Sequence, residues 1–430
     1  MTEENMSKLE ELIEQYCPDG VEYVPLSSIG TIKRGNGLQK KDFVKTGIGC
    51  IHYGQIYTKF GLFTDKTLTY VDKDLADHLL HIEKGDLVIA CTSENVEDVC
   101  KAVAWLGDDS IVTGGHSCVL HHNQNPKYIA YFFQTESFQR QKRKYAYGTK
   151  VIDIKPDSIA KIEIPVPPLP VQEEIVRILD AFTELQAELQ AELQKRKQQY
   201  NYYLDNLLNF NNINRGGYQA EVRWMKMSEV FETITDYTAA GSFKSIAENV
   251  KYLKSPDYAM LIRTTDLKSR FRKGDFIYVS KSAFDYLWRV KMDKECIVMP
   301  NVGNCGEIYY VHPNSLPYDN CALAPNAILV RSKLFNNKYL SYCLQVECFQ
   351  KQLAKITSPV GQSKFNKTEL KKLLVPIPSL ADQQKIVDIL DRFDRLTNDL
   401  SSGLPAEIEK RRQQYEYYRD KLLAFKRKGA

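Results

Sequence analysis

Three residues of this chain have the spacing of a metal-dependent nuclease. Asp257 follows a proline, and Asp266 and Lys268 follow in a DxK arrangement. In such enzymes two carboxylates hold Mg²⁺ and the lysine helps to activate water. A pattern this short often arises by chance, and the first half of the chain has no counterpart. We therefore interpret Asp257 and Asp266 as turn and loop residues and keep a nuclease as the less favoured alternative.

Other catalytic patterns are missing from the sequence. It has no Gly-rich loop for a nucleotide cofactor and no GxxxxGK[ST] phosphate loop. Methylation of an exocyclic amine typically uses an Asn/Asp-Pro-Pro-aromatic pocket, whereas the segments NPKY at Asn125 and SPDY at Ser255 lack the second proline. His116, Cys118 and His121 would point to alternating faces of a strand, so we expect buried free thiols there and no metal site. We expect no cofactor in this chain itself.

The remaining candidates are cations interleaved with aromatic and amide side chains, a mixture that suits a DNA surface. Cations neutralise phosphates, while arginine and amide side chains read the edges of bases. Residues 138–155 carry six basic residues and one acidic residue, although the net charge of the chain is only +4. Within this segment we expect Arg140, Lys142, Arg143 and Lys144 to contact phosphates if they touch DNA. The predicted DNA-binding residues are Lys33, Arg34, Lys40, Lys41, His52, Tyr53, Gln55, Tyr147, Gly148, Thr149, Lys150, Arg263, Thr264, Arg270, Arg272, Lys273, Asn301, Asn304, Gln362, Ser363, Lys364 and Asn366.

Length and composition indicate an ordinary globular protein. The 430 residues give room for two or three domains, and 43% are hydrophobic and 26% charged. No apolar run approaches the roughly 18 residues that a membrane span needs, and the polar N-terminus is not a signal peptide. The irregular spacing of the cysteines fits a reducing compartment, so we expect a cytoplasmic protein without a membrane partner.

The elements that must position the candidate residues occur twice. Residues 165–182 and 376–393 are identical at ten of 18 positions, and residues 195–208 and 410–423 at ten of 14. The first block recurs after 211 residues and the second after 215, so the second copy contains a four-residue insertion. Apolar residues at a spacing of three and four predict long coiled-coil helices, the first from about Val171. We expect the two helices to pair in antiparallel fashion, because the domain between them acts as a tether.

A globular domain precedes each long helix. From residue 21 to about 164, short apolar runs separated by Gly, Asp and Asn predict strands, followed by one amphipathic helix near residues 126–144. The same order of elements recurs from 221 to about 375 with different loops, which indicates two similar domains that recognise two different targets. A short helix at residues 5–16 should pack against the C-terminal helix. That C-terminal helix should break at SSGLP, where Gly403 can cap one helix and Pro405 can begin the next.

These alternating domains and helices, with the motifs QxxIVxILDxF and KRxQQYxYYxDxLL, resemble the specificity subunit of type I restriction–modification systems over essentially the whole chain. The resemblance implies an α+β fold with two similar α/β target-recognition domains. Two long antiparallel coiled-coil helices would separate them, with pseudo-two-fold symmetry. The implied regions are 1–164 (N-terminal helix and first target-recognition domain), 165–212 (central helical region), 213–375 (second target-recognition domain) and 376–430 (C-terminal helical region).

The resemblance also implies a non-catalytic DNA-recognition subunit. Each domain would bind one half of an asymmetric, bipartite site in double-stranded DNA. The helices would set the spacing and dock two methyltransferase subunits and, through them, restriction subunits. S-adenosylmethionine would belong to the methyltransferase partners, and ATP and Mg²⁺ to the restriction partners.

The helical spacer contains its own short repeat. The run TELQAELQAELQ at residues 183–194 resembles helix insertions that set the gap between half-sites in this family. Each four-residue unit adds about 6 Å of helix. The sequence leaves one further alternative, a coiled-coil scaffold whose domains bind peptides. Salt-dependent binding to DNA would distinguish the two, because only DNA binding releases condensed counterions.

Overall fold

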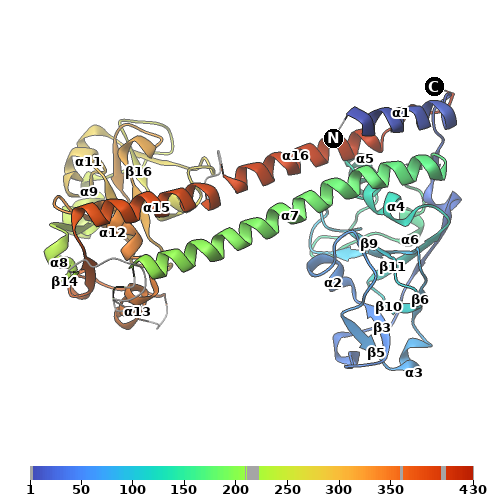
Figure 1. Ribbon diagram of the computed structural model, residues 1–430, viewed down its shortest axis with the longest axis horizontal. Helices are drawn as coiled ribbons and strands as arrows, with labels where there is room; N and C mark the ends of the chain where they lie inside the picture. The colour runs from blue at the N-terminus through green and yellow to red at the C-terminus, as the bar shows by residue number, and fades with distance from the viewer. Residues whose placement is uncertain (1–2, 209, 211–221, 359–361, 399–402, 430) are drawn as a thin grey trace. The chain divides into compact units, whose positions relative to one another are not determined.

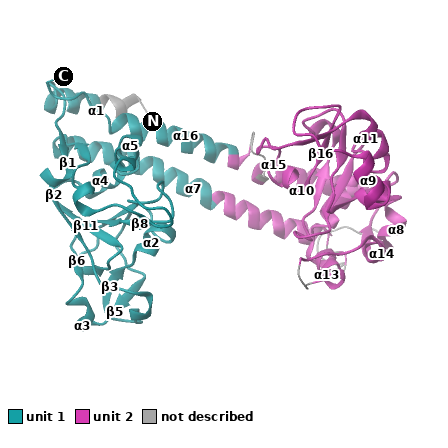
Figure 2. Cartoon of the chain, turned by 180° about the vertical axis from the view of Figure 1, so that it is seen from behind, with its two compact units in different colours: residues 1–191, 406–430 teal, residues 192–405 magenta. Residues whose placement is uncertain are grey.

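The computed structural model describes residues 3–208, 210, 222–358, 362–398 and 403–429. The chain folds into two compact units, shown in two colours in Figure 2: residues 1–191 with 406–430, and residues 192–405. Both contain sheets and helices, which confirms the predicted α+β class. The predicted boundary between residues 212 and 213 lies outside the described residues. No helix in the described part of the chain combines the length and apolar character that crossing a membrane requires.

Unit 1 is built on two sheets. The larger has the strand order β2-β11-β7-β9-β4, and the smaller has the order β5-β3-β10-β6, in which β10 runs parallel to β3. Two short pairs, β1–β13 and β12–β8, complete the unit. The strands are β1 (Tyr23–Pro25), β2 (Gly30–Arg34), β3 (Ile48–Ile51), β4 (Phe63–Thr64), β5 (Thr69–Val71), β6 (Leu80–Ile82), β7 (Leu87–Ala90), β8 (Thr92–Ser93), β9 (Ala102–Trp105), β10 (Ile111–Thr113), β11 (Ser117–His122), β12 (Ile152–Asp153) and β13 (Glu163–Pro165).

Unit 2 repeats this frame. Its larger sheet has the order β15-β21-β18-β19, so β21 lies between its neighbours as β11 does in unit 1. Its smaller sheet has the order β17-β16-β20, and β16 runs parallel to β20 as β3 does to β10. The strands are β14 (Arg223–Lys226), β15 (Thr233–Asp236), β16 (Ala259–Ile262), β17 (Ile277–Val279), β18 (Cys296–Pro300), β19 (Tyr309–Val311), β20 (Cys321–Leu323), β21 (Ala327–Arg331) and β22 (Leu374–Ile377).

The segment predicted as one amphipathic helix near residues 126–144 forms two helices, so that prediction is wrong in detail. α4 spans Pro126–Phe132 and α5 spans Glu136–Arg143. Thr135 separates them because its hydroxyl accepts a hydrogen bond from Phe138 N and donates one to Phe132 O, which ends one helix and caps the next. Unit 2 is divided at the same place into α12 (Asn337–Cys343) and α13 (Glu347–Ile356), although the residue before α13 there is Val346, which makes no side-chain capping bond.

The long helices form as predicted, and α7 (Leu169–Leu208) contributes to both units. In unit 1, α16 (Leu404–Leu422) lies alongside α7 (Figure 1). Phe182 contacts the rings of Tyr415 and Tyr418, and Gln186, one turn further along α7, donates to Arg411 O, one turn earlier in α16. This order confirms antiparallel pairing there.

In unit 2, the partner of α7 is α15 (Leu380–Asn398), whose Phe393 stacks on Tyr203 with ring centroids 5.0 Å apart. The predicted break in the second long helix is confirmed, since α15 ends at Asn398 and α16 begins at Leu404, with Pro405 in its first turn. The first two residues of the SSGLP segment lie outside the described residues.

The two ends of unit 1 are joined to each other. Val21 N donates to Lys426 O at 2.8 Å, and Lys428 N donates to Val21 O at 3.1 Å. Leu9 of α1 (Glu3–Tyr16) is buried in the same core as Leu422 of α16. The N-terminal helix therefore packs with the C-terminal segment, as the sequence predicted.

A repeated set of buried hydrogen bonds fixes each domain to its long helix. Gln172 of α7 is fully buried; its Oε1 accepts from Asn125 N at 3.1 Å, and its Nε2 donates to Pro167 O at 2.7 Å. Asn125 is the N-cap of α4, so the glutamine ties the start of a domain helix to the start of α7. The residues 211 positions later make the same bonds in unit 2: Asn336, Gln383 and Pro378.

A tyrosine and a lysine add further bonds between the domain and its long helix, and we call the whole set the clamp. Tyr131 OH donates to Asp180 at 2.7 Å, and Lys127 pairs with the other oxygen of Asp180 at 2.7 Å. A second tyrosine, Tyr128, donates to Pro165 O at 2.9 Å. Burial raises the pKa of both tyrosines, so their hydroxyls remain donors. The equivalents in unit 2 are Tyr342, Lys338, Asp391, Tyr339 and Pro376.

We expect Gln172→Leu to destabilise the protein. The variant keeps the side-chain volume but leaves Asn125 N and Pro167 O without this partner in a buried site, which costs about 1–3 kcal/mol for each group. The midpoint of urea unfolding, followed by circular dichroism, should fall. Gln194→Leu, at an exposed position of the same helix, is the matched control and should unfold near the wild-type midpoint. Equal midpoints for both variants would contradict the clamp.

Candidate nucleic-acid interface

Two predicted residues, His52 and Arg263, occupy the same place in the two units. Each follows the parallel strand of the smaller sheet and caps a short helix, α2 (Tyr53–Thr58) or α10 (Thr264–Lys268). The capping partner three residues later accepts from the backbone: Gln55 Oε1 from His52 N, and Asp266 Oδ2 from Arg263 N, both at 2.9 Å. This is the capping-box arrangement, which fixes the direction in which each helix begins.

The capping positions determine the burial and the hydrogen bonds of the His52 and Arg263 side chains. His52 is buried, and its Nδ1 accepts from Gly54 N at 3.2 Å. Burial, with smaller contributions from the charges of Lys40 and His116, lowers the pKa of His52, so the ring is neutral near pH 7. Arg263 holds Asp266 through Nε and Nη2 at 3.0 and 2.8 Å.

The nuclease pattern is used differently in the structure. Asp266 is buried against Arg263, and Lys268 pairs with Glu307 at 2.5 Å. Asp257 is exposed, and its carboxylate accepts from Tyr258 N at 2.6 Å. Asp257 is a loop residue, as the sequence interpretation expected. Asp266 is not, because it lies in the first turn of α10, where it completes the capping box of Arg263.

A hairpin is the second common part of the interface. In unit 1, Tyr147 bridges to Asp153, and Asp153 pairs with Thr92 of β8. Gly148 makes the turn possible with φ of 114°, since a Cβ there would lie only 2.0 Å from Val151 O. In unit 2 the equivalent bridges join Ser358 to Lys364 and Lys364 to Val302.

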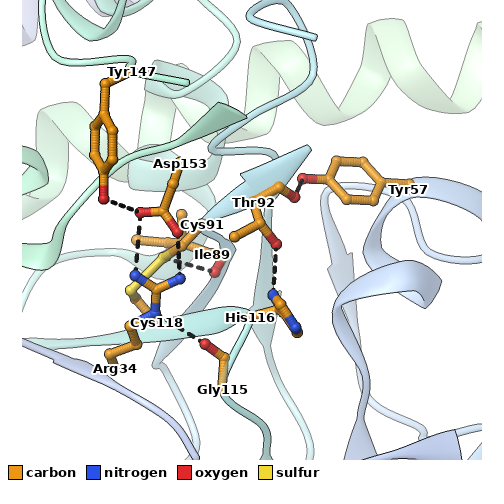
Figure 3. Close-up of a disulfide and its surroundings, with 10 residues drawn as sticks. All are labelled: Arg34, Tyr57, Ile89, Cys91, Thr92, Gly115, His116, Cys118, Tyr147 and Asp153. Carbon is orange, nitrogen blue, oxygen red and sulfur yellow. Dashed lines mark hydrogen bonds and ion pairs between the residues drawn. A yellow bond between two sulfur atoms is a disulfide. The ribbon is translucent and has the colours of Figure 1, made fainter. Parts of the chain in front are cut away.

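In unit 1 an ion pair locks this hairpin to the sheet (Figure 3). Arg34, at the end of β2, binds both oxygens of Asp153 at 3.1 and 2.6 Å, and Tyr147 OH donates to Asp153 at 3.1 Å. The hydrogen-bonded carboxylate raises the pKa of Arg34. Nearby, His116 bonds Thr92 Oγ1 at 3.0 Å (Figure 3), and its ring lies 4.7 Å from that of Tyr53. The hairpin and the start of α2 thus form one cluster.

In unit 2 the loop after β18 meets the hairpin directly. Gly303 N donates to Ser363 O at 2.8 Å, and Phe365 N donates to Asn301 O at 3.1 Å. These bonds bring the predicted residues Asn301 and Asn304 beside Gln362, Ser363, Lys364 and Asn366. Asn366 also caps α14 (Lys367–Leu370) by accepting from Glu369 N.

A cavity of about 720 Å³ opens beside this loop. Its walls include Tyr237, Phe243 and Tyr252, and Asn301 also lines it. Asn301 Oδ1 is buried and has no hydrogen-bond partner among the residues that the structure describes. The cavity gives unit 2 a mostly apolar, aromatic recess next to its predicted DNA-reading residues.

The remaining predicted residues are mostly exposed. Thr264, in the first turn of α10, is half-buried. In the described part of the chain no ion pair involves Lys33 or Lys41, and the structure does not join either to the hairpin. The exposed set is Lys33, Lys40, Lys41, Tyr147, Gly148, Thr149, Lys150, Arg270, Arg272, Lys273, Asn304, Gln362, Lys364 and Asn366.

Sequence reasoning did not single out Thr92, His116, Asp153 and Asn326, which the structure places among the candidate residues. His116 and Asn326 are equivalent, because His116 O accepts from Cys91 N and Asn326 O accepts from Asn301 N. The sequence did carry one signal of this equivalence: residues 87–91 (LVIAC) and 297–301 (IVMPN) resemble each other and end at Cys91 and Asn301. The missing information was which distant loop meets each strand end.

Two sequence expectations are corrected by the structure. Cys91 and Cys118 form a disulfide between the end of β7 and β11 (Figure 3), so the expectation of free thiols is wrong for this pair. The order β11-β7 places the two positions next to each other. Lys142 is not a phosphate contact: its side chain is buried, and Nζ donates to Glu97 O and Val99 O, both at 2.7 Å. Its neighbours Arg140, Arg143 and Lys144 are exposed.

We expect Lys142 to give the protein a pH-dependent stability. Burial lowers its pKa from about 10.5 to about 8. Between these two values the unfolded chain binds more protons than the folded protein, so the free energy of unfolding rises with pH across this window. Lys142→Met removes this pH dependence. The free energy of unfolding of the wild type minus that of the variant should therefore be more positive at pH 9.5 than at pH 7.5. A pH-independent difference in urea unfolding would contradict the buried ammonium.

Comparisons with known proteins agree on one family. A model described as "Type I restriction modification DNA specificity domain" matches residues 18–199 and again residues 219–410. The specificity subunit of the type I restriction enzymes EcoR124I/EcoR124II from Escherichia coli is 31% identical over 273 residues, which cover 62% of this chain and 63% of that protein. The chain thus spans just under two thirds of that relative. A putative type I specificity subunit of Mycoplasma pneumoniae, S.MpnORF89P, is 29% identical over 318 residues, covering 71% of this chain and 84% of that protein.

Solved structures share the fold across nearly the whole chain. One comes from work on complex assembly and conformational transition of the type I R-M system; it has a TM-score of 0.58 and 15% identity and covers 94% of this chain and 97% of that one. The S subunit from a Mycoplasma genitalium type I restriction–modification system has a TM-score of 0.51 and 16% identity, and covers 94% of this chain and 96% of that one. At these identities the likeness concerns the fold alone.

Proposed function

Because the chain belongs to the type I restriction modification DNA specificity family and carries two copies of its domain, we propose that each domain binds one half of an asymmetric, bipartite site in double-stranded DNA. In each unit a helix start, the loop after a central strand and a hairpin would together form the surface that reads one half-site. The proposal places the protein in the cytoplasm, where its DNA target lies.

The observation that carries this proposal is that the two units share the same backbone bonds but have different side chains at equivalent positions. The helix-start positions hold His52 in unit 1 and Arg263 in unit 2, in the same capping box. The bridged hairpin positions hold Asp153 in unit 1 and Lys364 in unit 2. A frame that keeps its backbone bonds while its side chains change in charge and hydrogen-bonding capacity suits two different base sequences.

We further propose that the chain is not itself catalytic. Two methyltransferase subunits would dock on the long helices and supply S-adenosylmethionine, and restriction subunits would join through them and supply ATP and Mg²⁺ chemistry. The assignment predicts that the purified chain neither methylates nor cleaves DNA, but gives a site-specific methyltransferase when mixed with its partner subunit. Comparing methylated bases in cells with and without this gene tests it, since loss of one split motif would name the target. Methylation or cleavage by the chain alone would refute it.

We expect the hairpin cations to contribute to DNA affinity. Lys150→Ala in unit 1 and Lys364→Ala in unit 2 should each weaken binding and reduce the slope of log K against log [salt] by up to about 0.9, because each lysine that contacts a phosphate releases about one counterion. Lys84→Ala is the control, as that exposed lysine pairs with Asp108 outside the proposed surface. Fluorescence anisotropy at several salt concentrations measures the slope. A slope unchanged in both variants would remove the hairpins from the interface.

The AELQ units provide a separate test of the two-domain arrangement. Deleting residues 187–190 removes one four-residue unit, or about 6 Å of helix. The gap between the two half-sites that supports methylation should change by one or two base pairs, while both half-sites stay the same. Sequencing of methylated DNA made with the reconstituted enzyme reads the gap and the half-sites together. An unchanged gap would contradict a helical spacer.

A further inference from the structure

The cavity of unit 2 has one wall that is formed by the apolar face of a short helix. α9 (Phe243–Asn249), labelled in Figure 1, contributes Phe243, Ile246 and Ala247 to the lining, and Val250 follows just after its end. These positions are three or four residues apart, so they lie on one side of the helix. Ile246 and Val250 are buried, whereas Phe243 and Ala247 are exposed. The wall is therefore apolar throughout and partly open to solvent.

Three aromatic rings line the same cavity. Tyr237 is buried, and its hydroxyl accepts a hydrogen bond from Tyr252 OH at 3.3 Å. Tyr252 is 51% exposed and Phe243 is 81% exposed, although both belong to the lining. Aromatic rings that are partly open to solvent offer a surface on which an unstacked nucleobase can stack, because every base has a π-face.

One polar atom in the lining lacks a partner. The amide nitrogen of Asn301 donates to Phe365 O, just after the hairpin, at 3.5 Å. This bond fixes the orientation of the amide, because the reverse orientation would bring two oxygens together. Asn301 Oδ1 is buried and has no hydrogen-bond partner among the residues that the structure describes. A buried acceptor without a partner costs free energy, and a ligand with an N–H group would remove that cost.

The charges around the cavity suit the phosphate of a nucleotide. Lys251 belongs to the lining and is exposed, and in the described part of the chain no ion pair involves it. Asp236 is the single acidic residue among the described residues of the lining, and Lys367 balances its charge at 2.8 Å. A phosphate beside the cavity would therefore meet an unpaired cation and no unbalanced carboxylate.

The cavity lies beside the proposed DNA-binding surface of unit 2. Asn301 and Val302 both line it, and Val302 bridges to Lys364 of the hairpin. Unit 1 differs at this place, because the equivalent of Asn301 is Cys91, whose sulfur is bonded to Cys118. A disulfide sulfur cannot replace the amide as a hydrogen-bond acceptor of similar strength. The amide site is thus a feature of unit 2.

We propose that this cavity receives one nucleobase that has turned out of the bound DNA helix, and that the base carries an exocyclic amino group. The amino group donates to Asn301 Oδ1, and the base stacks on the aromatic lining. Phe243, the most exposed of the three rings, enters the gap that the base leaves, as apolar wedges do in bent DNA. The inference rests on the proposed function and deepens it, because it names one group that unit 2 recognises in its half-site.

The energetics of base extrusion make the pocket selective. A base that leaves the helix loses its stacking and its pairing. Stacking on the cavity wall and the hydrogen bond to Asn301 offset this cost. Adenine, cytosine and guanine carry an amino group, whereas thymine does not and would leave Oδ1 unpaired. The cavity therefore adds discrimination at one base beyond those that the hairpin contacts.

The test is an abasic scan of the split motif that methylation mapping identifies. Each nucleotide of both half-sites is replaced in turn by an abasic one, and fluorescence anisotropy gives the affinity of the full chain, alone and with its methyltransferase subunit. At one position of one half-site, removal of the base that enters the cavity should weaken binding about tenfold, through the lost stacking. Removal of its pairing partner should strengthen binding, because no base pair then has to be broken.

Ala247→Trp assigns this response to the cavity. Ala247 is exposed, so the larger side chain can fill the cavity without entering the core. The gain from removing the pairing partner should disappear in this variant. Asn249→Trp is the matched control, since it adds the same ring at an exposed position of α9 outside the lining, and it should keep the gain. Both variants should unfold in urea near the wild-type midpoint.

Phe243→Ala tests the wedge at a position that is too exposed to affect folding. The variant should bind the intact duplex more weakly than the wild type does. Its affinity for the duplex that lacks the pairing partner should be less affected, because the wedge is needed to open the pair. Equal losses on both duplexes would remove Phe243 from base extrusion.

The base that becomes methylated needs separate treatment. A methyltransferase turns out the base that it modifies, so that position will also gain affinity when its partner is removed. Methylation mapping identifies this base, and its response should be the same in Ala247→Trp as in the wild type.

The outcomes separate this inference from the proposed function. If the split motif is bound but no position loses its gain in Ala247→Trp, the nucleobase pocket is refuted and the proposed function stands. If neither the chain nor its mixture with the methyltransferase subunit binds a split motif, both fail. If Asn249→Trp abolishes the gain as Ala247→Trp does, the response belongs to the surface of α9 and the pocket is overturned.

Discussion

The buried hydrogen bonds between each domain and its long helix are the constraint on which the rest of each unit depends. Apolar packing between a domain and a helix would tolerate sliding and rotation, because many arrangements of methyl groups bury similar area. A buried glutamine that must satisfy one backbone donor and one backbone acceptor tolerates far less, since a small displacement leaves both unpaired. Gln172 and Gln383 impose this condition in units 1 and 2, and the aspartates Asp180 and Asp391 impose a second one through a tyrosine and a lysine. These few bonds thus fix the position of each domain, and with it the loops of its proposed DNA-binding surface.

Within the frame fixed in this way, the two units diverge in the chemistry of equivalent contacts. Where the first strand of the larger sheet ends, unit 1 has Arg34 bound to Asp153 of the hairpin. At the equivalent strand end unit 2 has Asp236 bound to Lys367, just after its hairpin, so the contact persists with its charges exchanged. The first ion pair ties the hairpin of unit 1 to its sheet, and the second ties the start of α14 to the sheet of unit 2. Neither strand end would pair favourably with the other unit's partner. The loops of the proposed DNA-binding surfaces can differ between the units because both members of the ion pair have changed together.

The sequence predicted the parts of the fold that depend on local or repeated signals. The long helices, the break before Leu404, the two related domains and the packing of the N-terminal helix followed from apolar spacing, a Gly-Pro pair and the duplication. The division at Thr135 was missed because the apolar spacing runs on across it; unit 2 divides at the same place with Val346 and no side-chain cap. The burial of Lys142 was missed because composition alone cannot show that two carbonyl groups from a distant loop surround its ammonium. The cluster of His116, Thr92 and Asp153 was missed for the same reason, since strand pairing across about 60 residues creates it.

Because the chain contains two related units, burial and identity can be compared at equivalent positions. The comparison distinguishes residues that the fold requires from residues that it does not. A position that is buried and the same in both units, such as Gln172 and Gln383, is explained by the frame. A position that differs on the same backbone bonds, such as His52 and Arg263, is not required by the frame to be one residue type. A position that is exposed and the same, such as Tyr202 and Tyr417, is explained by neither packing nor divergence. Water places no demand for identity on an exposed ring.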